Sequence, residues 1–262
     1  MQVFEWAPPP MEDQVTEADL DGERIRRHAT QALDEAAREC HRVVPGVTVE
    51  TAAPEGAAAA TLARVAADRG APLLVIGSSG ISALPRVLLG STAAELVRSA
   101  DVPVVVVRSG DEDDEETTGR APVVVGVDGS PNSDPAVEFA FDVAHRHGAP
   151  LRAVHALSDL PPSLLTTGPV AARGPQVGRA GIGPEVPRQL DRHGSRYPDV
   201  DTTLVGAPDP PAHALLDAAR GARLLVVGSH GRGRVRRMFL GSVSHAALYH
   251  APCPVAVLRS AG

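Results

Sequence analysis

The apolar positions of the chain alternate between short continuous runs and stretches with helical spacing. The run from Val123 to Val127 leads into the turn Asp128-Gly129-Ser130, and a segment from Pro135 to His147 then carries one apolar face. Continuous apolar runs are typical of buried parallel strands, whereas apolar residues three and four apart indicate helices. Strands that alternate with helices predict an α/β fold with a parallel sheet and right-handed crossovers.

The alternation continues to the end of the chain, with one interruption. Residues 158 to 188 are rich in Pro, Gly, Thr and Ala and show little periodicity, so we expect a long surface insertion there. We expect one short helix at the end of the insertion, near Val186 to His193. Outside it we expect strands at Leu151 to Ala156, Thr202 to Val205, Arg223 to Val227 and Val255 to Leu258, and helices at Pro211 to Arg220 and Ser242 to His250.

The first part of the chain has a similar order of elements. We expect helices at residues 17–42 and 55–69, and strands at residues 47–50, 73–76 and 104–107. The acidic run from Asp111 to Glu116 repels itself and is expected to be a solvated linker. The sequence therefore predicts a first domain at 1–108, a linker at 109–121 and a second domain at 122–260.

One glycine pattern occurs twice, about 150 residues apart. The first copy is Gly77-Ser78-Ser79-Gly80, then nine residues and Gly90-Ser91; the second is Gly228-Ser229-His230-Gly231, then nine residues and Gly241-Ser242. Each copy lies between an apolar strand and a helix. Backbone N–H groups converge in such a loop and the helix dipole favours an anion, which suits phosphate binding. Two copies indicate a domain duplication.

The two copies of the domain are not equally complete. Alignment places Leu151 to Ala156 opposite Met1 to Trp6, so the first repeat has no equivalent of residues 122–150. The loss of a central strand would expose backbone groups and apolar surface. Two hypotheses follow: the chain begins at an internal methionine of a longer product, or the second and fourth strands of the first repeat pair directly in a four-stranded sheet.

Composition excludes several classes of protein. A net charge of −7 argues against general nucleic-acid binding, which needs basic surfaces. The chain contains no lysine, so a Walker A loop, a kinase strand lysine and Schiff-base chemistry are excluded. Neither a long apolar segment nor a signal peptide is visible, so we expect a cytoplasmic protein without membrane partners. No residue spacing indicates a metal site.

The paired pattern Gly-x2-Gly-x9-Gly-Ser, with Val-Gly-Val-Asp-Gly-Ser at residues 125–130, resembles the universal stress protein family, in its tandem, nucleotide-binding form. The resemblance implies doubly wound parallel sheets of order 3-2-1-4-5, related to the adenine nucleotide α-hydrolase fold. It also implies an ATP site at the carboxyl ends of the strands, with or without Mg²⁺. Finally, it implies a homodimer, or a pseudo-dimer, in which the last strands of two domains pair.

The resemblance also implies roles for residues of the second repeat. Asp128 would lie beside the ribose or the metal-associated phosphates, and backbone groups around Val154 would contact adenine. The glycine loop would wrap ribose and phosphates, and the start of the following helix would hold phosphate. The full candidate set is Gly126, Asp128, Val154, Gly228, Ser229, His230, Gly231, Arg232, Gly233, Arg234, Gly241, Ser242 and Val243.

Residue chemistry agrees with these roles but leaves structural alternatives open. Glycines permit close approach of the backbone to a ligand, and Ser242 could cap a helix and bind an anion. Ser242 could equally be a plain N-cap, Asp128 could serve only the turn with Gly129, and the loop glycines could form tight turns without a ligand.

The corresponding site in the first repeat is expected to be weak or empty. Its candidate residues are Gly77, Ser79, Gly80, Gly90, Ser91 and Thr92. The aspartate turn is missing there, and Ile81 and Ala83 stand where the second loop has Arg232 and Arg234.

These observations favour an adenine-nucleotide-binding stress-response regulator with little or no catalysis. Two alternatives stay open: an ATP-using enzyme of the nucleotide α-hydrolase superfamily, and a ligand-free module that assembles oligomers through its edge strands. No separate substrate domain or nucleophile is visible for the enzyme, and retention of the second motif argues against the ligand-free module.

Overall fold

The computed structural model describes residues 1–3, 17–78, 89–108, 121–156, 182–229 and 240–259. They form two compact units, residues 1–70 and 71–262. The units do not coincide with the domain boundaries expected from the repeats, and those boundaries stay a prediction. The insertion expected at 158–188 and the acidic linker lie largely outside the described residues.

The described residues of the first unit form two helices and extended chain. Helix α1 spans Glu17–Val43 and helix α2 spans Ala58–Asp68. Residues 47–50 form no strand, so the strand expected there is wrong. Among the described residues of this unit, one backbone hydrogen bond from Gln2 N to Ala52 O, at 3.0 Å, joins the two extended segments. A β-strand needs a bonded neighbour along its length, and a single bond does not supply one.

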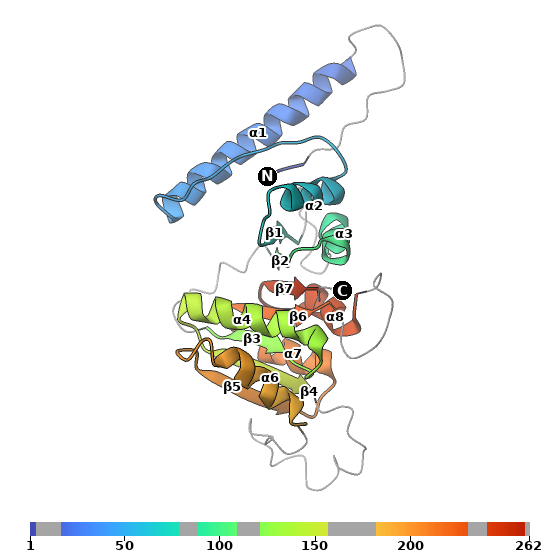
Figure 1. Cartoon of the computed structure of the whole chain (residues 1–262). Coiled ribbons are helices and arrows are strands. Elements are labelled where there is room, and N and C mark those ends of the chain that lie inside the picture. The colour runs from blue at the N-terminus through green and yellow to red at the C-terminus, as the bar shows by residue number, and fades with distance from the viewer. Residues whose placement is uncertain (4–16, 79–88, 109–120, 157–181, 230–239, 260–262) are drawn as a thin grey trace. The chain divides into compact units, whose positions relative to one another are not determined.

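The second unit is built on one seven-stranded sheet (Figure 1). The strands follow the order β1-β2-β7-β6-β3-β4-β5, and every pair is parallel except β2 with β7. Their bounds are β1 Leu74–Gly77, β2 Val104–Val107, β3 Val123–Gly126, β4 Leu151–Ala156, β5 Thr202–Ala207, β6 Leu224–Gly228 and β7 Val255–Leu258.

The second repeat is a complete doubly wound domain. Its strands lie in the order β5-β4-β3-β6-β7, which is the order 3-2-1-4-5 expected from the sequence. Helices α4 and α6 pack against each other on one face of the sheet, and α7 and α8 pack together on the other. The helices are α3 Ser91–Ser99, α4 Asp134–His147, α6 Glu185–Gly194, α7 Pro211–Ala218 and α8 Ser242–His250, with a 3₁₀ turn η2 at Pro131–Ser133.

Strand β3 lies at the centre of this domain. Its residues Val123, Val124 and Val125 have no solvent exposure, because helices cover both faces and strands bond both edges. Helix α4 packs Phe141, 1% exposed, onto the same core. The fully buried run explains why these positions read as continuously apolar rather than alternating.

The two repeats meet through their last strands. Strands β2 and β7 pair antiparallel, with Val105 opposite Ala256. Arg108, just after β2, donates hydrogen bonds to the carbonyls of Leu248 and Ala251 at the end of α8. Arg259, just after β7, donates in the same way to the carbonyl of Arg98 in α3, at 2.7 Å. This reciprocal arrangement is the pseudo-two-fold contact that the resemblance implied, formed within one chain.

Strand β1 of the first repeat has fewer described neighbours than its counterpart in the second repeat. Among the described residues it pairs only with β2, whereas its counterpart β6 pairs with both β7 and β3. Val75 is consequently 62% exposed, while the equivalent Val226 is fully buried. The expected exposure of apolar surface is confirmed. The alternative four-stranded sheet involves residues 4–6, which lie outside the described residues.

We predict that Arg108→Ala lowers the free energy of unfolding by about 1–3 kcal/mol, because it leaves two helix-terminal carbonyls without their charged donor. Urea denaturation measures the change. Arg98→Ala is the matched control, since the Arg98 side chain is exposed and only its carbonyl joins the contact. A loss no larger for Arg108→Ala than for Arg98→Ala would show that the arginine does not stabilise the seam.

Candidate functional site

The candidate residues of the second repeat gather at one edge of the sheet. Parallel pairing sets Gly126 opposite Val154 and Val125 opposite Val226, so β3, β4 and β6 end together. The chain leaves β3 and β6 in opposite directions, toward β4 and β7 respectively. That reversal marks the switch point, where ligands bind in doubly wound sheets.

The turn after β3 is held by the side chain of Asp128. Its Oδ1 accepts hydrogen bonds from the Ser130 amide at 2.9 Å and the Ser130 hydroxyl at 2.7 Å. Gly129 between them has φ of +76°, a conformation that side-chain-bearing residues rarely adopt. The turn role left open for Asp128 is therefore present, and a ligand role for it stays a prediction.

The two ends of the glycine loop after β6, at Ser229 and Gly241, lie close together, and we call this place the neck of the loop. The Ser229 amide donates to Leu258 O at 2.7 Å, and the Gly241 amide donates to Ser229 O at 2.8 Å. The two ends of the loop are thus bonded to each other beside the end of β6. His230, Gly231, Arg232, Gly233 and Arg234, five of the candidate residues, lie outside the described residues.

Helix α8 starts at this neck. Gly241 occupies the N-cap with φ −62° and ψ 152°, and no side chain caps the helix. The interpretation of Ser242 as an N-cap is wrong, because the extended Gly241 takes that position and Ser242 becomes the first helical residue. Its side chain is exposed. The amides of Ser242 and Val243 belong to the first turn, which has no intrahelical acceptors for its N–H groups.

The first repeat contains the same neck. The Ser78 amide donates to Val107 O at 2.8 Å, and the Gly90 amide donates to Ser78 O at 2.7 Å. Gly90 has φ −61° and ψ 150°, close to Gly241, and Ser91 and Thr92 open helix α3. Gly77 ends β1, while Ser79 and Gly80 lie outside the described residues. No described strand stands beside β1 where β3 stands beside β6, and among the described residues no counterpart of Asp128 faces this neck.

Val154 lies inside strand β4. Its side chain is 3% exposed, and its carbonyl accepts a hydrogen bond from the Val127 amide at 2.9 Å. The strand continues through His155 to Ala156. A contact between adenine and backbone groups around Val154 stays a prediction.

Two side chains that sequence reasoning missed fix the ends of β3 and β6. His155, 7% exposed, donates from Nδ1 to the carbonyl of Val127 at 2.8 Å, since a carbonyl can only accept. The Ser244 hydroxyl donates to the carbonyl of Gly228 at 2.6 Å. The sequence contained a signal for His155, which is a polar residue inside an apolar strand. It contained no signal for Ser244.

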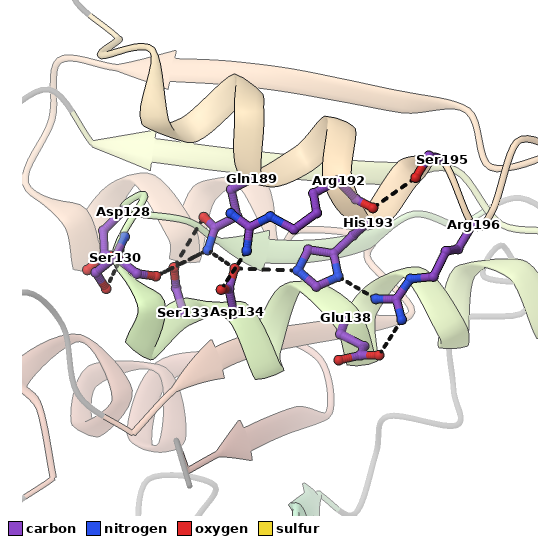
Figure 2. Close-up of polar contacts among 10 residues, drawn as sticks. All are labelled: Asp128, Ser130, Ser133, Asp134, Glu138, Gln189, Arg192, His193, Ser195 and Arg196. Atoms are coloured by element: carbon purple, nitrogen blue, oxygen red, sulfur yellow. Dashed lines mark hydrogen bonds and ion pairs between the residues drawn. The ribbon is translucent and has the colours of Figure 1, made fainter. Parts of the chain in front are cut away.

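A cluster of polar side chains joins helix α6 to the start of helix α4, close to the Asp128 turn (Figure 2). Gln189, 1% exposed, donates to Asp134 Oδ1 at 2.7 Å, and Arg192 Nη1 donates to Asp134 Oδ2 at 2.9 Å. Burial acts to raise the pKa of Asp134, but hydrogen bonds from Gln189, His193 and Arg192 outweigh it and hold that pKa below its ordinary value.

Comparison with known proteins decides the family. The model of the universal stress protein family matches residues 1–108 and 119–259, nearly the whole chain. The chain belongs to the universal stress protein family. A universal stress protein of Mycolicibacterium smegmatis is 39% identical over 240 residues, which is 90% of this chain and 78% of that protein. One of Mycobacterium tuberculosis strain H37Rv is 43% identical over 193 residues, 72% of this chain.

Two further comparisons bear on extent and fold. The chain spans only 62% of the Mycobacterium tuberculosis protein. A crystal structure of a universal stress protein from Archaeoglobus fulgidus aligns over 98% of this chain and 88% of its own, with a TM-score of 0.67 and 19% identity. That likeness supports the tandem α/β fold. In the described part of this universal stress protein, no helix has the length and apolar character needed to cross a membrane.

We expect Gly129→Ala to destabilise the protein more than Gly148→Ala. Both glycines have positive φ, +76° and +58°, so each substitution adds about 1–2 kcal/mol of backbone strain. A Cβ on Gly148 meets nothing, whereas one on Gly129 meets Glu185 Cγ at 2.4 Å and Val186 Cγ2 at 3.2 Å. Crowding should add about 1–3 kcal/mol in urea denaturation. Equal losses for the two variants would mean that α6 does not press on the turn.

The lowered pKa of Asp134 predicts a pH dependence of stability. A carboxylate whose pKa is depressed in the folded state stabilises the fold at pH values above its ordinary pKa of 3.8. This contribution to stability is lost as the pH falls below that pKa. The stability difference between the wild type and Asp134→Asn should therefore be largest near neutrality and shrink in acid. Urea denaturation across that range tests this; a difference independent of pH would contradict it.

Proposed function

We propose that the second repeat binds ATP at the carboxyl edge between β3 and β6, and that the protein is a nucleotide-binding regulator with little or no catalysis. The arrangement that supports this most strongly is the pairing of two loops at the switch point. The glycine-loop neck and the start of α8 follow β6, and the Asp128 turn follows the adjacent β3.

The residues present fit a phosphate-bearing ligand. First-turn amides of α8, with the exposed Ser242 hydroxyl, supply hydrogen-bond donors where the helix dipole favours negative charge. The remaining loop candidates, Gly228 to Arg234, would wrap the phosphates and ribose. Asp128 would face the ribose or a phosphate-bound Mg²⁺, and backbone groups around Val154 would contact adenine. ATP, when bound, supplies a triphosphate whose charge these donors can hold.

Contacts at Asp128 favour binding over catalysis. It is the candidate general base at this edge, yet its Oδ1 holds the turn through two hydrogen bonds from Ser130. A regulator needs no general base, since it acts by binding ATP differently in two conformations.

The first repeat would contribute mainly structure. Its described residues include the neck but no neighbouring aspartate turn, so within them phosphate would meet donors on one side only. Strands β2 and β7 pair with each other within the chain. Two single domains would use these same strand edges to form a dimer. A further homodimer and a cytoplasmic location stay part of the proposal.

Purified protein tests the proposal directly. Heat denaturation followed by chromatography identifies any nucleotide carried through purification, and ATP turnover is then followed with Mg²⁺. Bound or titratable ATP with negligible turnover is the expected result. Rapid turnover would support the ATP-using enzyme instead, and the absence of any nucleotide binding would support the ligand-free module.

Ser242→Asp should separate ligand binding from folding. An acidic residue in the first turn of a helix stabilises it by about 0.3–1 kcal/mol, so the fold should be kept or strengthened. The same charge would repel a triphosphate, and we expect ATP affinity to fall by at least tenfold in calorimetric titration. Ser91→Asp, at the equivalent exposed position of α3, is the matched control and should change affinity little. An unchanged affinity in Ser242→Asp would remove α8 from the site.

A further inference from the structure

We propose that helix α6 is coupled to the nucleotide site through Gln189, so that ATP binding at the Asp128 turn orders α6 and α6 in turn sets ATP affinity. This inference rests on the proposed function. It assigns to Gln189 a positioning role, since its side chain reaches the turn and not the ligand.

Helix α6 forms the wall behind the turn. Its first residues approach Gly129 so closely that a Cβ there would overlap Glu185 and press on Val186. Val186 itself is fully buried. Because Gly129 separates Asp128 from Ser130, a shift of this part of the turn toward α6 would meet the side chains of Glu185 and Val186. The start of α6 therefore limits movement of the turn toward it.

Polar contacts strengthen this coupling. Gln189 Nε2 lies 3.0 Å from Ser133 Oγ and 3.2 Å from the carbonyl of Ser130, and Ser133 Oγ donates to the same carbonyl at 2.9 Å. Ser130 in turn donates twice to Asp128. A continuous chain of hydrogen bonds thus joins the middle of α6 to the candidate ligand-facing carboxylate (Figure 2).

Asp134 fixes the direction in which Gln189 donates its hydrogen bonds. An ionised carboxylate only accepts, so the amide nitrogen of Gln189 must point at it, which fixes the orientation of the whole amide group. Both N–H groups are then directed at the start of α4 and the turn. Gln189 is buried, so breaking these contacts would leave unsatisfied polar groups away from water.

The far end of α6 anchors the helix to α4. Arg196 Nη2 donates to His193 Nδ1 at 2.8 Å, so His193 carries its proton on Nε2, which points at Asp134 Oδ1 3.4 Å away. Arg196 Nη1 also pairs with Glu138 at 3.0 Å. The N-terminal half of α6, which contains Glu185, Val186 and Gln189, is therefore the part of the helix that contacts the turn.

Linkage makes the coupling reciprocal. If ATP at the turn favours the ordered α6, a variant that uncouples α6 must lose ATP affinity by the same factor. Couplings of this kind are worth about 5- to 150-fold in affinity. We expect Gln189→Met, which keeps the length of the side chain without its hydrogen bonds, to weaken ATP binding by about 5- to 50-fold.

Hydrogen exchange of the full chain, followed by mass spectrometry with and without saturating ATP, tests the inference. In the wild type, ATP should slow exchange of the α6 amides severalfold. In Gln189→Met, ATP at a concentration that saturates the variant should leave their exchange unchanged. Arg188→Ala, an exposed neighbour on the same helix, is the control and should behave as the wild type.

Each outcome is decisive. If the wild type binds ATP while α6 exchange does not change, the inference is wrong and the proposed function stands. If ATP slows α6 exchange by the same factor in wild type and Gln189→Met, Gln189 is merely structural and the inference is again wrong. If the wild type binds no ATP, the proposed function fails and the inference with it. Should Gln189→Met not fold, unchanged α6 exchange in the ATP-bound wild type would still overturn the inference.

Discussion

The whole arrangement depends on strand β3 being bonded on both edges and covered on both faces. Val123, Val124 and Val125 are fully buried between β4 and β6, so the end of β3 has little freedom of position. The Asp128 turn therefore projects from a rigid base, one strand away from the glycine-loop neck. His155 and Ser244 add hydrogen bonds at the ends of β3 and β6, which fix the exit directions of both loops. A binding edge made from two loops needs this common support.

The first repeat shows a similar loop without a described strand in that place. Its neck repeats the backbone hydrogen bonds of the second neck within 0.1 Å. Yet β1 lacks a described neighbour on one side, and Val75 is exposed where Val226 is buried. The two repeats share the local backbone geometry, which depends on glycine positions and helix starts. Among the described residues they do not share the second loop of the site, which depends on a strand elsewhere in the chain.

Sequence reasoning predicted most elements of the second repeat because buried strands and amphipathic helices have distinct periodicities. The order of the strands in the sheet came from the family resemblance. It failed at 47–50, where a strand-like composition has too few bonds to a neighbour to form a strand. It misassigned Ser242 because serine favours the N-cap, while Gly241 takes that position here. The role of Gln189 was not predictable: its partners Ser133 and Asp134 are more than fifty residues away, and only the packing of α6 on α4 brings them together.

We propose that one repeat, not two, holds a nucleotide. Calorimetric titration of ATP into the full chain measures the number of sites directly. We expect one ATP per chain, because among the described residues only the second neck faces an aspartate turn. Two equivalent sites per chain would show that the neck alone suffices and that β3 is not required, and a chain that takes up no ATP would contradict the nucleotide site altogether.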